Sequence, residues 1–309
     1  MRVIITGGSG LIGRALTENL TKDGHEAIIL SRNPGKVRGL PAGSRALAWD
    51  AKTAQGWGAQ ADGADAIVNL AGESLKGRGF LPSRWTKRRK QAIRQSRLDA
   101  GAAVVAAIRQ AKRKPKALVQ ASAVGYYGPH GSEPLDELAA PGRDFLAGVC
   151  VDWEASTAEV ELLGVRRAIA RTGLPLTMRG GAFPLLVLPF RMFGGNTFGS
   201  GRQFYPWIHF DDAIAALRLL IENPEASGPY NISAPNPVSN RDFARTLGRV
   251  LHRPAWVPVP RFALQLALGE VSTVVMDGQR ALPQKLLEAG FAFQYTDLEA
   301  ALAELLKKG

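Results

Sequence analysis

The sequence of 309 residues predicts an α/β protein, a doubly wound parallel sheet with a smaller, mostly helical C-terminal cap. Two observations support this prediction. Short apolar, β-branched runs alternate with segments of helical spacing over the first part of the chain, which is the order of βα units in a parallel sheet. Beyond residue 237 the pattern is mainly helical, with a proline-rich break at 253–260.

The first βα unit contains a glycine-rich turn. An apolar run over 1–6 leads into Gly7, Gly10 and Gly13, and the apolar spacing predicts a helix over 11–23. Glycines at this spacing let the backbone turn sharply and approach a pyrophosphate, and the new helix offers that anion free N–H groups and a positive dipole end. An ordinary turn is the alternative. The strand before it and the helix after it favour a dinucleotide-binding loop.

The end of the second strand distinguishes the two nicotinamide cofactors. The strand is predicted over 26–30, and Ser31 and Arg32 follow it, with Lys36 and Arg38 close by and no acidic residue. Loops that select NAD usually carry an acidic residue here for the ribose 2′-hydroxyl, whereas a guanidinium suits a 2′-phosphate. The sequence therefore favours NADP(H) over NAD(H), and a basic surface loop is the alternative.

Several later strands end in residues suited to a cofactor or a substrate. Asp50 follows the third strand, where side chains flank an adenine, and the small Ala71 and Gly72 after the fourth strand let a flat ring or a ribose approach the backbone. Ser122 stands at the tip of the fifth strand. Strands are predicted at 46–49, 66–70, 117–121, 165–171 and 230–232, and helices at 84–111, 145–163 and 211–222, the last capped by Asp211 or Asp212.

The order of these elements suggests two lobes. We expect residues 1–172 to form a dinucleotide-binding Rossmann domain to which 209–233 returns. The segment 173–208 is rich in Gly and Pro with an apolar centre, and together with 234–309 it is expected to form a substrate-side cover and a helical lobe.

Composition limits the class of protein. Hydrophobic residues make up 46% and charged residues 21%, which is ordinary for a soluble globular protein. No apolar run reaches the roughly 18–20 residues of a membrane helix, and the start of the chain lacks a signal-peptide pattern. A single cysteine, Cys150, excludes an internal disulfide framework, and no histidine has a partner at ligand spacing. We therefore expect a cytoplasmic protein without a metal site or membrane contact.

Nearly all of the net charge of +12 lies in one stretch. Between Arg84 and Lys116 the chain carries twelve Lys and Arg residues against Asp99 alone. No nucleic-acid-binding motif accompanies this stretch. We therefore interpret it as a solvated basic helix face near an anionic cofactor or substrate, rather than as a nucleic-acid patch.

A set of short motifs extends over nearly the whole chain, and together they resemble the extended and atypical short-chain dehydrogenase/reductases. More closely, they are similar to the epimerase-like family described as nucleoside-diphosphate-sugar epimerases, which has a C-terminal domain of unassigned role. The motifs are Thr6–Gly13, Asn69–Glu73, Arg84–Thr86, Ser96–Arg97, Ser122–Gly128, Asp152–Glu154, Gly199–Gln203, Trp207–Asp212 and Arg280–Phe291.

The resemblance implies an NADP(H) site. It places Arg32 on the 2′-phosphate, Asp50 near the adenine, and Ser122 over the nicotinamide, where the wider superfamily uses Ser or Thr to hydrogen-bond a reacting carbonyl or hydroxyl. A homodimer through the long basic helix is an analogy that the charge of this helix disfavours. The cofactor-binding residues implied are Thr6, Gly7, Gly10, Leu11, Ile12, Gly13, Ser31, Arg32, Asp50, Asn69, Leu70, Ala71, Gly72 and Ser122.

One departure from the superfamily pattern affects catalysis. The usual Tyr-x-x-x-Lys helix supplies a tyrosine acid/base and a lysine that lowers its pKa. The chain contains no such motif, and the matching helix reads Cys150-x-x-x-Glu154. A carboxylate would raise the pKa of a neighbouring acid, so the usual proton-transfer residues are missing.

The candidate site residues each have a structural alternative. Ser122 and Tyr126 are the candidate catalytic residues, although Ser122 could be a polar strand end and Tyr126, like Tyr127, could pack against the cover. Glu73, Arg97 and Arg202 are candidate substrate contacts, but Glu73 and Arg97 could form an ion pair and Arg202 could be an exposed loop residue. Structural roles are preferred for Cys150, Glu154 and His209.

The leading hypothesis is an NADP(H)-binding, epimerase-like oxidoreductase with non-standard acid/base residues. It would transfer hydride to or from a small carbonyl, alcohol or sugar-like substrate. The alternative is a catalytically inactive NADP(H)-dependent sensor or regulator, for example in cell division, that kept the cofactor loop after losing the acid/base pair.

Overall fold

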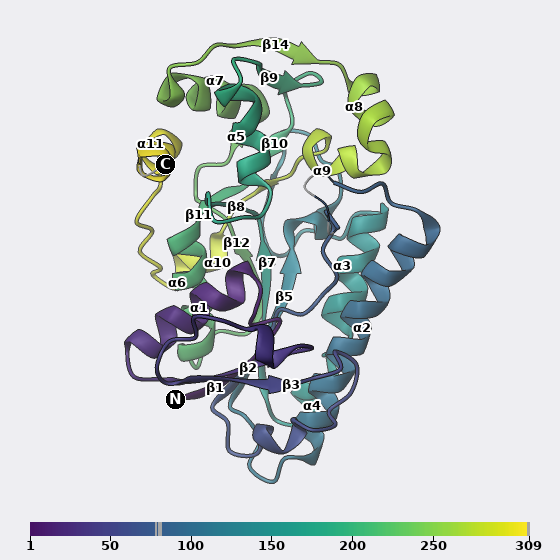
Figure 1. Ribbon diagram of the computed structural model, residues 1–309, viewed down its shortest axis with the longest axis vertical. Coiled ribbons are helices and arrows are strands. Elements are labelled where there is room, and N and C mark those ends of the chain that lie inside the picture. Colours follow the sequence, from purple (N-terminus) through teal and green to yellow (C-terminus); the bar gives the residue numbers. More distant parts are fainter. Residues whose placement is uncertain (78, 80–81, 308–309) are drawn as a thin grey trace.

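A seven-stranded parallel sheet forms the centre of the computed structural model, which describes residues 1–77, 79 and 82–307 apart from the side chains of 256 and 257. All neighbouring strands are parallel, so the predicted doubly wound sheet is confirmed. The strands, from one edge to the other, are β12 (Gly228–Ile232), β7 (Arg166–Thr172), β5 (Ala117–Ala123), β4 (Ala66–Asn69), β1 (Arg2–Thr6), β2 (Glu26–Ser31) and β3 (Ser44–Ala48) (Figure 1).

Helices cover both faces of this sheet, each over its own apolar core. Side chains of β1 alternate between the two cores: Val3 and Ile5 belong to one, and Ile4 belongs to the other. On the first face lie α1 (Leu11–Lys22) and α6 (Phe210–Glu222), and on the second lie α2 (Lys87–Gln110), α3 (Phe145–Ala155) and α4 (Glu159–Leu162) (Figure 1).

The helix predicted over 145–163 is broken in the structure. α3 ends at Ala155, and α4 begins only at Glu159. The hydroxyl of Ser156 donates a 2.7 Å hydrogen bond to the carbonyl of Trp153. Such a side-chain bond offers the backbone an alternative to continuing the helix.

The start of α6 also differs from the prediction. Its N-cap is His209, whose ring nitrogen accepts the backbone N–H of Asp211 at 3.3 Å, so the predicted capping by Asp211 or Asp212 is wrong. The Asp212 carboxylate instead accepts the backbone N–H groups of Gln294 and Tyr295 at 2.8 and 3.0 Å. Asp212 therefore ties the end of the chain to the sheet domain.

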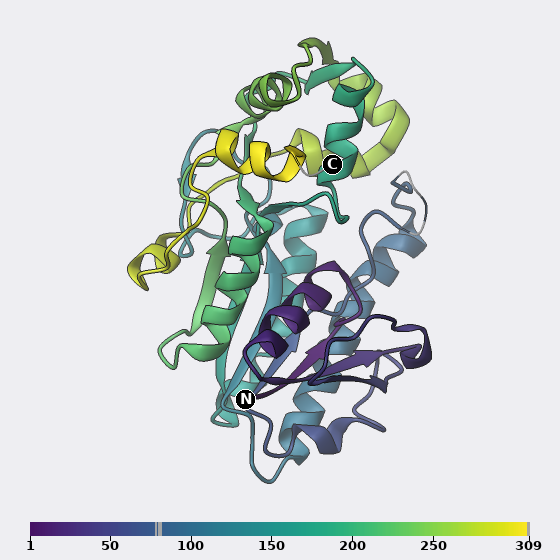
Figure 2. The same ribbon diagram turned by 60° about the vertical axis from the view of Figure 1, so that its left-hand side comes forward.

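The cap has a core of its own, built around Phe183, Trp207, Phe243 and Leu302. The predicted break at 253–260 contains a strand, β14 (Ala255–Val259), which pairs in parallel with β9 (Gly195–Phe198). The other elements of the cap are β8 (Leu174–Leu176), α5 (Phe183–Arg191), β10 (Phe204–Tyr205), β11 (Trp207–His209), β13 (Val238–Ser239), α7 (Asn240–Leu251), α8 (Arg261–Leu268), α9 (Thr273–Met276) and α11 (Leu298–Lys307). Figure 2 shows the cap, coloured from green to yellow, above the sheet.

Residues late in the chain complete the sheet domain. Strand β15 (Arg280–Ala281) pairs with β6 (Pro134–Leu135) beside the sheet, and α10 (Gln284–Glu288) follows it. The buried Glu137 carboxylate accepts backbone N–H groups from Asn231 of β12 and Lys285 of α10. Burial raises the pKa of Glu137 despite these hydrogen bonds.

The basic stretch is partly neutralised by its neighbours. Lys90 forms an ion pair with Glu270, Arg94 with Asp152 and Arg109 with Glu159. These pairs connect α2 to α3, to α4 and to the segment before α9. Among the described residues, no helix combines the length and the apolar character needed to cross a lipid bilayer.

Candidate functional site

The glycine-rich turn forms a close cradle at the N-terminus of α1. Gly7 has a φ of +65°, and a Cβ on Gly13 would lie 2.5 Å from the Cα of Gly8. Only glycine fits either position. α1 starts after Gly10 without a side-chain cap and has no acidic residue in its first turn. Its first N–H groups are therefore available to an anion, and the cradle fits a pyrophosphate.

A cleft of about 290 Å³ runs from this turn across the ends of the strands. Arg32 is exposed at one end of it and pairs with no other described residue. A free guanidinium at this place suits a phosphate group. The lining residues are Gly7, Ser9, Gly10, Leu30, Ser31, Arg32, Trp49, Ala51, Leu70, Ala71, Gly72, Glu73 and Ser96.

The structure gives Asp50 a local role. Its carboxylate accepts the backbone N–H groups of Lys52 and Thr53 at 2.8 Å each, and these hydrogen bonds lower the pKa of Asp50. Its neighbours Trp49 and Ala51 line the cleft instead. Trp49 is an aromatic residue in this lining, although its side chain is only 5% exposed and packs in the apolar core of the second face.

Thr6 and Asn69 lie inside the sheet, directly below the cleft. The Thr6 hydroxyl donates to the Asn69 side chain at 2.7 Å and accepts the backbone N–H of Ala71 at 3.2 Å. The Asn69 amide then donates to Gln120 at 2.9 Å. This chain of hydrogen bonds crosses β1, β4 and β5 and fixes the backbone of the loop at Ala71 against the glycine-rich turn.

Ser122 is paired with a buried carboxylate. It is the register partner of Arg171 on the neighbouring strand, so both side chains lie on one face of the sheet. Glu154 of α3 lies over this face, accepting the Ser122 hydroxyl at 2.7 Å and two guanidinium N–H groups of Arg171 at 2.9 Å each. All three side chains are buried. Because the Ser122 hydrogen is donated to Glu154, it is not offered to a substrate.

Arg171 also holds the two tyrosines that follow Ser122. Its guanidinium carbon lies 3.4 Å from the centre of the Tyr126 ring, and it donates to the Tyr127 hydroxyl at 3.1 Å. The Tyr127 hydroxyl donates in turn to Asn231 at 2.7 Å. Burial raises the pKa of Tyr127 to about 12. Tyr126 and Tyr127 do not line the cleft at the glycine-rich turn, and they do not line a second cleft that lies between the sheet and the cap.

Cys150, which the resemblance matches to the usual tyrosine, is buried in α3. Burial, followed by the charge of Glu154, raises the pKa of its thiol to about 11. A buried thiol with this pKa is a poor acid/base catalyst at neutral pH. The sequence has no Tyr-x-x-x-Lys pair. In this part of the fold Glu154 instead forms an ion pair with Arg171.

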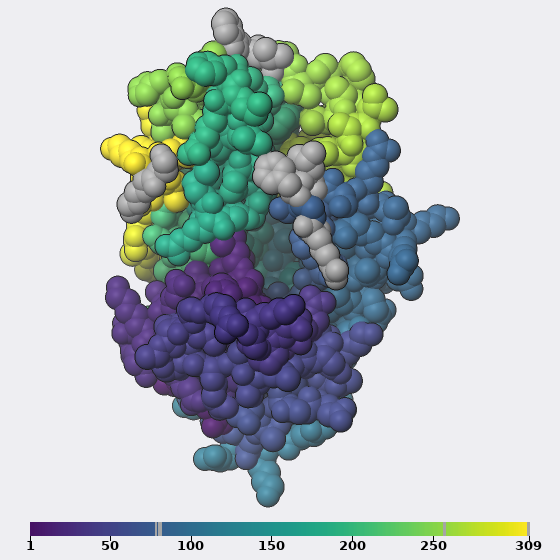
Figure 3. Space-filling view, in the orientation of Figure 1, coloured from purple at the N-terminus to yellow at the C-terminus, as the bar shows by residue number. Residues whose placement is uncertain are grey.

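A second cleft, of about 300 Å³, lies between the ends of β5 and β7 and the cap. In the space-filling view the surface is hollowed between the N-terminal part of the chain and the cap above it (Figure 3). Most of the lining is apolar, and it comes from α3, α5, β8 and the segment around α9. The lining includes Leu75, Arg97, Val124, Leu146, Val149, Cys150, Trp153, Leu174, Leu186, Tyr205 and Val275.

Arg97 stands between the two clefts. Its guanidinium donates to the backbone carbonyls of Glu73, at 3.2 Å, and Ile93, at 2.8 Å. The proposed Glu73–Arg97 ion pair does not form, because Arg97 contacts the main chain of Glu73 rather than its carboxylate. The guanidinium carbon would lie 3.0 Å from a Cβ on Gly72, so a larger residue there would displace Arg97.

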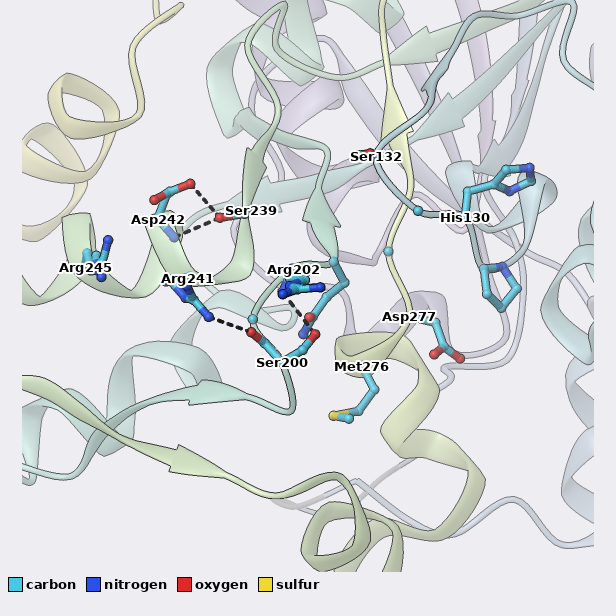
Figure 4. A pocket seen from close by; sticks show the side chains of 15 residues that line it. His130, Ser132, Ser200, Arg202, Ser239, Arg241, Asp242, Arg245, Met276 and Asp277 are labelled. Carbon is cyan, nitrogen blue, oxygen red and sulfur yellow. Dashed lines mark hydrogen bonds between the residues drawn. The ribbon is translucent and has the colours of Figure 1, made fainter.

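Arg202 lines a different cavity, an open groove of about 760 Å³ in the cap. Figure 4 shows it beside Arg241 of α7, which donates to the carbonyl of Ser200. The structure therefore brings Glu73 and Arg97 together and leaves Arg202 apart from them. His209 is a helix cap, as stated above. Among the described residues, no group of three or more His, Cys, Asp or Glu side chains is arranged to hold a metal ion.

Sequence reasoning missed several residues of the two clefts. Trp49 and Ser96 line the cleft of about 290 Å³ at the glycine-rich turn, the cofactor-side cleft. Trp153 lines the second cleft, of about 300 Å³, which is the apolar cleft. Trp153 lies in one of the quoted family motifs, which was the only sequence signal for it. The predicted adenine neighbour was Asp50, but the residue that lines the cleft is the preceding one, Trp49.

Comparisons with known proteins agree with this geometry. Residues 3–147 match the model of the NAD dependent epimerase/dehydratase family, and residues 259–305 match a domain of unknown function (DUF1731). The epimerase family protein YfhF of Bacillus subtilis is 41% identical, over 99% of this chain and 98% of its own. The chloroplastic SDR39U1 homolog of Arabidopsis thaliana is 38% identical, over 99% and 87%.

A solved structure is similar over the whole length of both chains. The human epimerase family protein SDR39U1, isoform 2, crystallised with NADPH, is 32% identical, with a TM-score of 0.87 and coverage of 100% of each chain.

Proposed function

The chain belongs to the NAD dependent epimerase/dehydratase family, and from that premise we propose that it is an NADP(H)-dependent oxidoreductase acting on a small carbonyl or alcohol. The observation that carries this proposal is the apolar cleft of about 300 Å³ next to the cofactor-side cleft. A dry cleft at the carboxyl ends of parallel strands is where this kind of fold binds its reactants.

The residues of the first cleft account for cofactor binding. The turn at Gly7, Gly10 and Gly13 and the N-terminus of α1 hold the pyrophosphate, and Arg32 binds the 2′-phosphate. The backbone after β4 supports the ribose and nicotinamide half. NADP(H) supplies the hydride donor or acceptor when bound. The NADPH in the human relative supports the choice of cofactor.

The chain's own contribution to the reaction is binding, orientation and exclusion of water. The apolar lining from α3, α5 and the α9 segment seats the substrate and keeps solvent from the reacting carbon. Ser122 acts through Glu154 rather than on the substrate, since its hydroxyl hydrogen is donated to that carboxylate. Its role is to fix the backbone at the end of β5, next to Ala123, which lines the cleft.

One observation favours a second candidate function. The Glu154–Arg171 ion pair occupies the region of the usual acid/base pair and presents neither charge to a ligand. A non-catalytic NADP(H)-dependent sensor would need only the first cleft. In that case the protein would bind NADPH tightly and would bind a partner protein in a cofactor-dependent way.

Hydride exchange tests the proposal. We expect NADPH deuterated at C4 to lose its label stereospecifically when it is incubated with the protein and a panel of small apolar aldehydes and ketones, some of which carry a carboxyl group. Leu186→Trp, which fills the apolar cleft, should abolish transfer and leave the NADPH Kd unchanged. Leu188→Trp, on the exposed side of the same helix, is the control. Tight NADPH binding without label loss on any carbonyl would contradict the enzyme and favour the sensor.

A further inference from the structure

Two hydrogen-bond donors without a full set of acceptors line the apolar cleft. Trp153 is only 7% exposed, and its indole N–H has no hydrogen-bond acceptor among the described residues. The Arg97 guanidinium lies over the Trp153 ring, with its central carbon 4.6 Å from the ring centre. Both of its described hydrogen bonds are made by one terminal nitrogen, Nη1. The other two nitrogens of the guanidinium group, Nε and Nη2, donate to no described residue.

The positive charge of Arg97 also lacks a partner in its cleft. Among the described residues that line this cleft, Arg97 is the one Lys or Arg. Two acidic residues share the lining, but both are engaged elsewhere. The Asp144 carboxylate accepts the backbone N–H of Ala147 at the start of α3, and Asp277 forms an ion pair with Arg261. No ion pair connects Arg97 to a described carboxylate.

Keeping the buried Trp153 N–H and the half-buried charge of Arg97 away from water is unfavourable unless an acceptor reaches them. Burial lowers the pKa of Arg97, which reflects the cost of holding its charge away from water. A donor held away from water without an acceptor is destabilising, and more so when it is charged. A planar carboxylate that accepts from a guanidinium and from an adjacent indole N–H would remove both costs.

We propose that Arg97 and Trp153 form a carboxylate-binding site, and that the substrates of the apolar cleft are small apolar oxo- or hydroxy-acids. The inference rests on the proposed function and adds the substrate class. Arg97 binds the carboxylate next to Gly72, where the cofactor-side cleft begins. The apolar residues of α3 and α5 then hold the hydrocarbon part, and a polyhydroxylated sugar finds few hydrogen-bond partners there.

Binding of a matched pair of probes tests the site without requiring turnover. The probes are 4-methylpentanoate and its neutral isostere 4-methylpentanamide, titrated by calorimetry into the protein saturated with NADPH. We expect the carboxylate to bind at least about tenfold more tightly than the amide, the size of one charge-assisted hydrogen bond. Binding should also quench indole fluorescence, because Trp153 contacts the ligand.

Three variants assign this preference to the two donors. Arg97→Met keeps the length of the side chain and should remove the preference for the carboxylate, while Trp153→Phe should reduce it several-fold. Arg94→Met removes a charge from the same helix, but Arg94 is exposed and pairs with Asp152, so it should change nothing. If Arg97→Met proves unstable in a thermal melt, Arg97→Lys should keep part of the preference.

The outcomes separate this proposal from the proposed function. Equal binding of the two probes, no binding of either at millimolar concentration, or a preference that survives Arg97→Met would overturn the carboxylate site. A loss of NADPH affinity in Arg97→Met, with the probe preference intact, would also overturn it, because Arg97 would then bind the cofactor. Failure of the unmodified protein to bind NADPH would instead contradict the proposed function.

Discussion

The Ser122 hydroxyl donates to the Glu154 carboxylate at 2.7 Å, and both side chains are buried. Arg171 holds the same carboxylate through two further hydrogen bonds. Burial alone lowers the pKa of Arg171, but the hydrogen bonds and charge of Glu154 raise it above its ordinary value. The Arg171 guanidinium therefore keeps its charge in this buried region.

Removing one partner of this ion pair should destabilise the fold. Glu154→Gln leaves the buried Arg171 charge without a counter-ion, and we expect the free energy of unfolding in urea to fall by about 3 kcal/mol. Glu159→Gln is the matched control, because its ion pair with Arg109 is exposed and should contribute less than about 1 kcal/mol. Equal effects of the two substitutions would show that the buried network does not stabilise the protein.

Arg32 should determine the choice between the two nicotinamide cofactors. Arg32→Ala removes a charge-assisted contact to the 2′-phosphate and should weaken NADPH binding by roughly 10- to 100-fold while leaving the NADH Kd unchanged. Calorimetric titration of both cofactors measures the ratio. Arg45→Ala, which removes an exposed arginine already paired with Glu26, should leave the ratio as it was. An unchanged ratio in Arg32→Ala would contradict the phosphate contact.

The turn at Gly13 should not tolerate even a methyl group. In Gly13→Ala the new Cβ would lie 2.5 Å from the Cα of Gly8, so the turn must open and cofactor binding should be lost. Gly148→Ala, in the interior of α3, meets nothing within 4 Å and should stabilise the protein by up to about 1 kcal/mol. Thermal melts with and without NADPH measure both effects. If NADPH still raised the melting temperature of Gly13→Ala, the pyrophosphate cradle would be refuted.

The single cysteine should be unreactive at neutral pH. With its pKa raised to about 11, the Cys150 thiol is almost entirely protonated at pH 7, and its alkylation rate should rise about tenfold per pH unit through pH 9. Iodoacetamide labelling of the folded protein, followed by mass spectrometry, measures the rate. The urea-unfolded chain should react like an ordinary thiol. A rate that levels off near pH 8.5 in the folded protein would contradict the buried environment.

The sheet could be predicted because its signals are local. Apolar alternation and the glycine spacing placed strands and helices close to their observed bounds, as for α1 and β2. The cap of α6 could not be predicted, because an aspartate before a helix reads as a cap. The Asp212 carboxylate instead accepts the backbone N–H groups of Gln294 and Tyr295, which lie about 80 positions later in the chain.

The candidate site could likewise be predicted only in part. The sequence indicated that Glu154 stands where a lysine is usual, and it could not indicate that Arg171 of a neighbouring strand neutralises it. Arg97 was a candidate, but its partner Trp153 is apparent only once α2 and α3 are packed together. The short paired strands β9 and β14 carry little apolar alternation, and β14 contains one proline, Pro258, which a sheet edge tolerates.

The contacts of Glu137 and Asp212 with residues 285, 294 and 295 set an order for biosynthesis. A chain synthesised only as far as β12 already contains every strand of the sheet and the Asn231 N–H that binds Glu137. Glu137 still lacks the N–H of Lys285, and Asp212 lacks both of its backbone partners. Each such omission costs about 1–3 kcal/mol, a large part of the stability of a typical domain. The sheet domain therefore gains these hydrogen bonds only when residues 285–295 have been synthesised.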